Sequence, residues 1–213
     1  ESSYLDVPRA WLGEAFIAEA EALRDSNERA YRHVYLGEIT GTGGQVFDNL
    51  TLRAILLTHL HFDHAGGCAA MSAATGLPAR VGREDWDLRD TLLSGGMLFG
   101  LPPVPAFEAD PLEPGPVPAG TWGSLNCTVL HVPGHSPGSL CYYFPEEKAL
   151  LAGDVIFYRS VGRTDLPGGD FDTLCRSLRS AVYTLPPDTV IYPGHGEPTT
   201  VGSEAASNPF CPA

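Results

Sequence analysis

The sequence of 213 residues lacks several features that mark particular classes of protein. It has no run of 18 apolar residues, so we expect no membrane-spanning helix. Its 13 basic residues form no stripe, and 26 acidic residues give a net charge of −13. Because a protein that holds nucleic acid or an anionic membrane surface needs an excess of basic charge, we expect neither partner.

Cysteine is scarce, and its spacing contains no C-x-x-C pair. The five cysteines are scattered and odd in number, at positions 68, 127, 141, 175 and 211. This pattern is typical of reduced thiols in the cytoplasm, and we expect the first four to be small buried side chains. The N-terminal residues ESSYLDVPRAW also lack the charged and apolar regions of a secretory signal, which agrees with a cytoplasmic location.

A hydrophobic content of 43% and a charged content of 18% are typical of a folded globular protein. Residues 8–36 predict helices, because Trp11, Phe16, Ile17 and Leu23 recur at roughly helical spacing. After a glycine-rich break the sequence alternates short β-rich runs with helices. A proline-rich connection, residues 101–118, predicts an irregular surface loop beside any cleft.

Four β-rich runs lead directly into histidine or aspartate. The runs are Ala54–Thr58, Thr128–Val132, Lys148–Gly153 and Thr189–Tyr192. The side chains that follow them are His59, His61, Asp63, His64, His135, Asp154 and His195. Because sites in layered folds lie where strands end, we expect these seven side chains to meet. His33 and His131 do not follow a strand, and we expect structural or surface roles for them.

The spacing of the first four of these residues suits metal binding. His59 and His61 are two residues apart, so an extended backbone points both to the same side. Asp63 and His64 follow at the start of a helix rich in small residues and can face a second ion. Imidazoles with a minority of carboxylates suit zinc, and iron, manganese and cobalt accept the same donors. The sequence therefore predicts two divalent ions, with zinc as the first choice.

Four segments carry a resemblance to a known family: THLHFDHAGG, VPGHSPGS, AGDVIFYRSVGRTDLPGGD and YPGHGEPTT. They resemble the metal motifs of glyoxalase II-like hydrolases of the metallo-β-lactamase superfamily, over residues 54–213. The resemblance implies an α+β fold, the αββα sandwich, with the site at one edge of two packed sheets. It also implies a first metal on His59, His61 and His135, a second on Asp63, His64 and His195, and Asp154 bridging both.

The same resemblance implies an enzyme that acts on a small molecule. A hydroxide bridging two divalent ions would attack an ester, thioester, lactone or phosphoester bond. Asp63 would orient the hydroxide and move a proton. Arg163 lies on a loop beyond Asp154, where it could meet an anionic group of the substrate or pair with one of the chain's own acids.

Residues 1–53 depart from the family pattern, because they lack the β-strands and the D-x-G turn with which family members begin. They resemble instead a stretch of a phage terminase large subunit, without a Walker A motif. We interpret the chain as a natural or cloning-derived chimera of two domains, 1–53 and 54–213, with the sandwich truncated or rearranged at its first strands. An uncovered sheet edge pairs with other chains, so we expect a homodimer in which the N-terminal segments can be exchanged.

Other functions stay open at this point. A mononuclear iron enzyme such as a persulfide dioxygenase would need one metal, whereas seven donors favour two. A β-lactamase proper usually carries a signal peptide. A non-catalytic phage DNA-packaging fragment is disfavoured by the acidity and the absent ATPase motif. The chain also has only 18 residues after His195, without the helical extension with which glyoxalase II enzymes bind glutathione, so the resemblance does not settle the substrate.

Overall fold

The computed structural model describes residues 21–22, 24–25 and 52–213. Contacts divide the chain into Glu1–Thr51 and Leu52–Ala213, and the fold described below is that of the second unit. In the first unit the four described residues are helical. The other residues of the helices expected over 8–36, His33, the terminase-like segment and the exchange of N-terminal segments lie outside the described residues.

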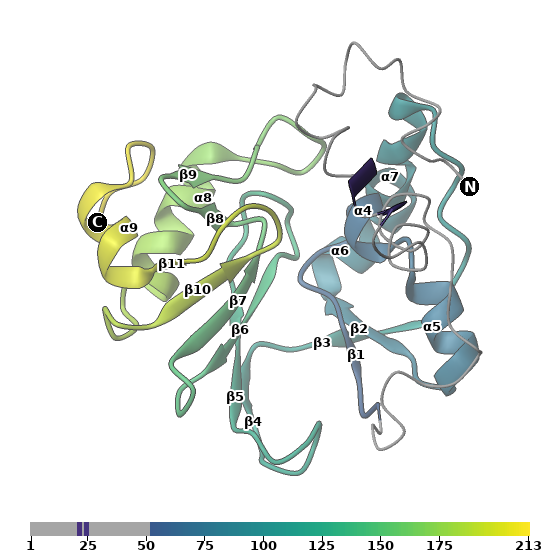
Figure 1. Ribbon diagram of the computed structural model, residues 1–213, viewed down its shortest axis with the longest axis horizontal. Coiled ribbons are helices and arrows are strands. Elements are labelled where there is room, and N and C mark those ends of the chain that lie inside the picture. Colours follow the sequence, from purple (N-terminus) through teal and green to yellow (C-terminus); the bar gives the residue numbers. More distant parts are fainter. Residues whose placement is uncertain (1–20, 23, 26–51) are drawn as a thin grey trace. The chain divides into compact units, whose positions relative to one another are not determined.

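Two β-sheets form the centre of the second unit (Figure 1). The smaller sheet is parallel, with the order β1-β2-β3. Its strands are β1 Ile55–Leu56, β2 Ala79–Gly82 and β3 Ala109–Leu112. The larger sheet has the order β11-β10-β7-β6-β5-β4 and is mostly antiparallel, but β7 and β10 run parallel. Its strands are β4 Gly115–Val117, β5 Cys127–His131, β6 Leu140–Phe144, β7 Ala149–Gly153, β10 Val190–Pro193 and β11 Thr199–Thr200. A separate hairpin pairs β8 Ile156–Phe157 with β9 Ser160–Val161.

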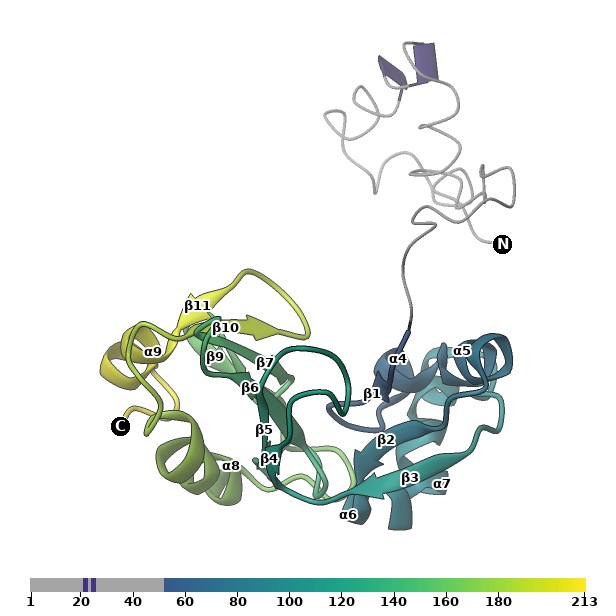
Figure 2. The same ribbon diagram turned by 90° about the horizontal axis from the view of Figure 1, so that it is seen from below.

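Helices lie on the outer side of each sheet (Figure 2). Those beside the larger sheet are α8 Phe171–Ser177, its continuation η3 Leu178–Val182, and α9 Val201–Ser207. Those beside the smaller sheet are α4 Phe62–Ala65, α5 Cys68–Thr75, α6 Arg83–Asp87, α7 Arg89–Leu93 and η2 Ser94–Phe99. This arrangement of helix, sheet, sheet and helix confirms the predicted α+β sandwich. No helix within the described residues has the length and apolar character that a membrane crossing requires.

The buried apolar side chains form three clusters that match these layers. One cluster lies between the larger sheet and its helices and includes Leu150, Leu174 and Ile191. A second lies between the smaller sheet and its helices. The third joins the two sheets through Tyr142, whose ring is buried and whose hydroxyl donates to the carbonyl of Leu57 at 2.7 Å. The facing sheets are therefore held by apolar packing and by a buried hydrogen bond.

The four β-rich runs predicted to precede the site are all strands, β1, β5, β7 and β10. The proline-rich connection over residues 101–118 was predicted to be irregular, and this is wrong in part. It contains β3 and β4, which carry Pro111 and Pro116. Both strands lie at the edge of their sheets, where a residue without an N–H group can be accommodated.

The prediction of reduced cysteines is wrong for two of the five. Cys175 of α8 and Cys211 form a disulfide with a Cα–Cα distance of 5.3 Å. Spacing in the sequence could not reveal this pair, because 36 residues separate its members and α9 lies between them. Cys68, Cys127 and Cys141 are free and buried, as predicted. The cytoplasmic location, which rested partly on reduced thiols, stays a prediction.

Candidate metal centre

The structure brings together the five histidines and two aspartates that follow the four strands. His59 and His61 lie in the loop between β1 and α4, and His61 is the N-cap residue directly before α4. The other five are on α4 or in the segments that follow β5, β7 and β10: Asp63, His64, His135, Asp154 and His195. His131 does not join them, since its Nε2 lies 2.8 Å from the carbonyl oxygen of Pro137.

The seven side chains form two groups with different exposure. His59, His61 and His135 form the first group, and all three are buried. The second group contains Asp63, His64, Asp154 and His195. Within each group, the potential donor atoms lie within 4.8 Å of one another. The first group is thus a closed set of three imidazoles, whereas the second is mixed and open to solvent at one side.

Asp154 lies between the two groups. Its Oδ1 is 3.3 Å from Nε2 of His64. Its Oδ2 is 3.5 Å from Nε2 of His195 in the second group and 3.9 Å from Nε2 of His135 in the first. One carboxylate therefore faces imidazoles of both groups, as a bridging ligand would.

The donor set of the first group fits a cation. Nε2 of His61 is buried and has no hydrogen-bond partner within the part of the chain that the structure describes. Nε2 of His59 and Nε2 of His135 lie only 3.2 Å apart. A buried nitrogen without a partner costs free energy, and a metal ion would satisfy all three lone pairs at once.

Burial keeps the imidazoles of the first group neutral. It lowers the pKa of His59, His61 and His135, and the neighbouring histidines lower those of His59 and His61 further. The pKa of His61 falls from 6.5 to about 4. Since a metal ligand must offer a free lone pair, these side chains are ready to bind near neutral pH without first losing a proton.

The second group has the opposite electrostatics. Burial alone would lower the pKa of His64, but the Asp154 carboxylate, 3.3 Å away, and the charge of Asp63 outweigh burial and raise it. Burial would raise the pKa of Asp154, but the neighbouring His64 and the charge of His135 outweigh burial and lower it. Both shifts favour an ion pair of His64 and Asp154 in the metal-free protein.

Backbone carbonyls and glycines set the positions of the donors. Nδ1 of His135 lies 2.8 Å from the carbonyl oxygen of Arg163, so an Nδ1–H donated there leaves Nε2 free to bind metal. A Cβ on Gly194 would lie 2.2 Å from Oδ1 of Asp154, and one on Gly162 would lie 1.7 Å from the carbonyl oxygen of Asp154. Because neither residue has a side chain, the backbone at Gly162 and at Gly194 can lie directly against Asp154.

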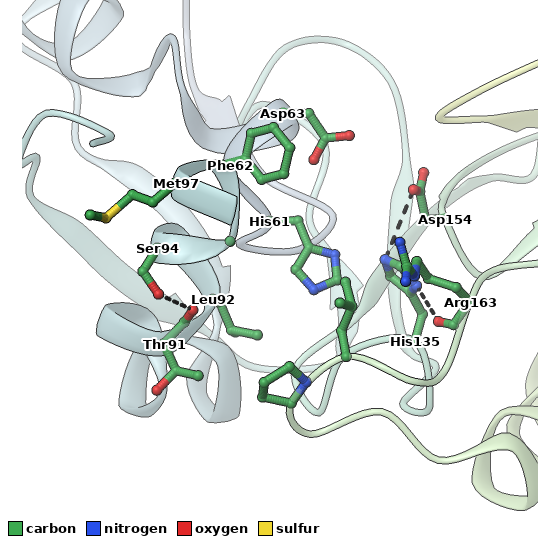
Figure 3. Close-up of a pocket in the computed structure, with 13 residues that line it drawn as sticks. His61, Phe62, Asp63, Thr91, Leu92, Ser94, Met97, His135, Asp154 and Arg163 are labelled. Atoms are coloured by element: carbon green, nitrogen blue, oxygen red, sulfur yellow. Dashed lines mark hydrogen bonds and ion pairs between the residues drawn. The ribbon is translucent and has the colours of Figure 1, made fainter. Parts of the chain in front are cut away.

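A cavity of about 620 Å³ opens beside the two groups (Figure 3). His61, Asp63, His135 and Asp154 line one side of it, together with Arg163. The guanidinium of Arg163 is exposed and donates from Nε and Nη2 to both carboxylate oxygens of Asp165, each at 2.8 Å. Arg163 was considered either for contact with an anionic substrate group or for pairing with an acid of the chain. The structure contains the second of these, the pair with Asp165.

Comparison with known proteins decides the family. Residues 41–195 match the sequence profile of the Metallo-beta-lactamase superfamily. The chain belongs to this superfamily. The match begins ahead of residue 54, so it includes part of the segment for which we predicted a terminase-like origin, and no comparison bears on that prediction.

Curated members of the superfamily match about three quarters of the chain. Hydroxyacylglutathione hydrolase GloC of Haemophilus influenzae is 37% identical over 163 residues, 76% of this chain and 77% of its own. The probable metallo-hydrolase YqgX of Bacillus subtilis is 41% identical over 169 residues, 76% of each chain. The names of both relatives agree with a metal-dependent hydrolase.

Solved structures of the superfamily share the fold. TTHA1623, solved in a di-iron-bound form, is 43% identical with a TM-score of 0.68, covering 76% of this chain and 78% of its own. The B3 metallo-beta-lactamase BLEG-1 is 38% identical with a TM-score of 0.69, covering 91% of this chain and 85% of its own. The His and Asp groups described above are therefore the metal-binding site of a superfamily member.

One buried acid beside the centre was missed by the sequence analysis. Asp85 of α6 is fully buried and contacts the loops that carry His59, His61 and His135. It lies in a run of charged residues, Arg83–Asp87, which is typical of an exposed helix. A signal that could have found it is the short β-rich run Ala79–Gly82, which makes Asp85 another acid that closely follows a strand.

Proposed function

We propose that the chain is a hydrolase that uses two divalent metal ions to cleave an ester, thioester, lactone or phosphoester bond. The observation that carries the proposal is the position of Asp154, whose two carboxylate oxygens face imidazoles of both donor groups. His59, His61 and His135 would hold one ion, Asp63, His64 and His195 the other, and Asp154 both. Such ions lower the pKa of water and polarise the bond to be cleaved.

The remaining chemistry falls to side chains at the open part of the site. Oδ2 of Asp63 lies 3.2 Å from Nε2 of His195, and both side chains are partly exposed. Asp63 is therefore placed to orient the attacking water and to accept its proton. Hydrolysis adds the hydroxyl group to the acyl or phosphoryl centre, and the proton passes to the leaving oxygen or sulfur.

Zinc remains our first choice of metal, because five imidazoles with two carboxylates suit it. Iron is the first alternative, since a related structure was solved in a di-iron-bound form. A mononuclear iron enzyme of the persulfide dioxygenase kind would leave the second donor group without a role. A non-catalytic DNA-packaging fragment would leave the whole centre without one.

The test is metal analysis combined with hydrolysis. We expect about two ions per chain, loss of hydrolysis on chelation, and recovery with zinc, manganese or cobalt. His131→Gln is the control, because His131 lies outside both donor groups. One iron per chain together with oxygen consumption on a persulfide would favour the dioxygenase. Full activity in metal-free protein would refute the proposal.

A further inference from the structure

The cavity beside the metal centre has a second side of different chemistry. It is formed mainly by apolar side chains from α4, α7, η2 and the loop after β9, with Thr91 and Ser94 among them. Figure 3 shows Phe62, Leu92 and Met97 across the cavity from Asp154 and Arg163. Leu166 and Pro167 extend the apolar lining. A substrate held with its reactive bond at the metal centre would therefore place a neighbouring group against an apolar surface.

Glycines of η2 shape this surface. A Cβ on Gly95 would lie 3.5 Å from Cδ1 of Phe62, and one on Gly96 would lie 3.0 Å from two atoms of the same ring. The turn Ser94–Phe99 is thus packed most closely against the Phe62 ring at Gly96, where a side chain would push the ring aside, whereas a Cβ on Gly95 would make an ordinary contact. The ring is adjacent to His61 and Asp63 in the sequence, so the packing fixes an apolar wall directly beside the proposed ligands.

The charges around the cavity disfavour an anionic substrate group. Arg163 is the one residue with a permanent positive charge among the described residues that line it. Its guanidinium is already paired through two hydrogen bonds to Asp165, which keeps the pKa of that carboxyl at about 2. In the metal-loaded enzyme the bound ions would offset the charges of Asp63 and Asp154, so a carboxylate is disfavoured where the substrate extends away from the metal centre. There the described lining residues offer it no unpaired cation.

We propose that this cavity binds the uncharged, apolar acyl group of an ester, thioester or lactone, and that it discriminates against acyl groups that end in a carboxylate. This inference rests on the proposed hydrolase function and specifies its substrate class. Phe62, Leu92, Met97 and Leu166 contact the acyl chain, and Asp165 neutralises the cation that would otherwise attract an acid.

A series of acyl thioesters on one common thiol tests this inference with the metal-loaded protein. From acetyl to hexanoyl, kcat/KM should rise about two- to fourfold for each added methylene group, the range expected for burial of apolar area. Succinyl thioester, which replaces the end of the butanoyl chain by a carboxylate, should be at least about tenfold poorer than butanoyl thioester.

Two variants make the test specific. Met97→Ser should flatten the dependence on chain length, whereas Met71→Ser should not. These two methionines are the only ones in the chain. Met71 lies on α5, outside the cavity. It is 41% exposed and Met97 is 58% exposed, so the two substitutions change similarly exposed side chains. Asp165→Asn should improve succinyl thioester relative to butanoyl thioester, because it frees Arg163.

The outcomes distinguish this inference from the function on which it rests. Metal-loaded protein that hydrolyses no member of the series and no ester, lactone or phosphoester would refute the proposed function. Hydrolysis of phosphoesters alone would leave the function intact and overturn the assignment of the cavity. Hydrolysis without dependence on chain length, or faster hydrolysis of succinyl than of butanoyl thioester, would leave the function intact and overturn the assignment of the cavity.

A second inference concerns Asp85, whose carboxylate has no exposed surface. Oδ2 accepts hydrogen bonds from the backbone N–H of Leu60 and the hydroxyl of Ser136, both at 2.9 Å. Oδ1 accepts from the backbone N–H of Gly138 at 2.6 Å. Leu60 stands between His59 and His61, and Ser136 directly follows His135. One buried carboxylate thus joins the two loops that carry every imidazole of the first donor group.

The backbone around this junction is packed as closely as glycine allows. A Cβ on Gly82, at the end of β2, would lie 2.0 Å from the carbonyl oxygen of Gly138. A Cβ on Gly138 would lie 2.5 Å from the backbone nitrogen of Asp85. The start of α6 is therefore held against the loop after His135, which fixes the distance from Asp85 to both loops.

The structure assigns to Asp85 the role of a positioning residue that sets the spacing between the His59–His61 loop and His135. It touches neither substrate nor metal in this role. Asp85→Asn retains the size of the side chain and one acceptor oxygen but replaces the other oxygen by a donor. It should therefore loosen the junction without leaving a hole.

The test of this role is the affinity for metal, measured by competition with a chelator and determined separately for each of the two ions. Asp85→Asn should weaken binding of the ion at the three histidines about 10- to 100-fold, as for other residues that orient metal ligands. Ser136→Ala, which removes one donor to Asp85, should weaken it less. Asp87→Asn, at an exposed acid of the same helix, is the control.

Urea unfolding of the metal-free variants separates positioning from general stability. A folded Asp85→Asn protein that binds the ion at the three histidines within about twofold of the unchanged chain would overturn the assignment, and so would an equal loss of affinity at both donor groups. If Asp85→Asn does not fold, the affinity of Ser136→Ala for that ion decides.

Discussion

Oδ1 of Asp154 lies 3.3 Å from Nε2 of His64, and the pKa values of the two groups are shifted in opposite directions. Both shifts favour the ionised pair in the metal-free protein, so a cation bound there would compete with the proton of His64 for the place beside Asp154. The neighbouring His64 thus favours the charged form of a carboxylate that is 11% exposed in its side chain.

Removal of the Asp154 charge should therefore remove the second ion. We expect Asp154→Asn and Asp154→Ala to retain the fold, to bind about one ion instead of two, and to lose at least about 100-fold in kcat/KM, because metal assistance contributes several kcal/mol. Elemental analysis and steady-state kinetics measure both effects. Unchanged turnover in either variant would show that Asp154 is not the bridge.

Gly194 should not accept even a methyl group. The Cβ of Gly194→Ala would lie 2.2 Å from Oδ1 of Asp154 and 2.7 Å from Cε1 of His64, so these two side chains or the loop after β10 must move. We expect a loss of about 1–3 kcal/mol in the free energy of unfolding and weaker binding of the second ion. Gly67→Ala is the matched control, since no atom lies within 4 Å of its Cβ position. Equal behaviour of the two variants would refute the steric argument.

The metal-free protein should lose stability as the pH falls. The pKa of His61 is about 4 in the folded chain and near 6.5 in the unfolded chain, so the unfolded state binds the proton more tightly. The stabilisation is complete above pH 6.5, is lost as the pH falls towards 4, and amounts to on the order of 3 kcal/mol for His61. His59 and His135 act in the same direction. His64 opposes them, because its raised pKa stabilises the fold below pH 6.5 and ceases to do so at higher pH.

Urea unfolding of chelated protein between about pH 7 and pH 4.5 measures this dependence. His61→Gln should reduce its slope, whereas His131→Gln should leave the slope unchanged, since His131 lies outside the three-histidine group. A free energy of unfolding that is flat or that rises over this range would contradict the assignment of neutral imidazoles.

The disulfide between Cys175 and Cys211 should stabilise the chain. It closes a loop of 36 residues, for which the loss of freedom in the unfolded state predicts about 4 kcal/mol. A reducing agent, or the double variant Cys175→Ser with Cys211→Ser, should lower the unfolding midpoint accordingly. Alkylation with mass spectrometry counts the thiols directly. Five free thiols in untreated, unfolded protein would restore the prediction of reduced cysteines.

The predicted homodimer is tested by the association state. Within the described residues β1 is the edge strand of the smaller sheet, and such an edge invites pairing with another chain. We expect light scattering to give the mass of a dimer, and a variant lacking residues 1–45 to aggregate. A shortened protein that is soluble, active and monomeric would end this prediction.

The sequence predicted more of the candidate site than of the structure around it. His59, His61 and Asp63 were found because a strand of branched apolar residues ends just before them, a local pattern that needs no knowledge of the fold. Asp85 and the Cys175–Cys211 pair depend on contacts between segments far apart in the chain, and neither has a local pattern. The apolar side of the cavity was missed for the same reason, since Phe62 and Leu166 come to line one cavity only in the folded chain.

Both donor groups draw side chains from the two sheets. The first takes two histidines from the loop after β1 and one from the segment after β5, and the second takes its members from α4 and from the segments after β7 and β10. Each bound ion would thus link one half of the sandwich to the other. Because binding to the folded state alone stabilises it by mass action, supply of metal would govern the lifetime of the protein as well as its turnover. Scarcity of metal would then lower the amount of enzyme through unfolding and proteolysis, beyond the inactivation of molecules that remain folded.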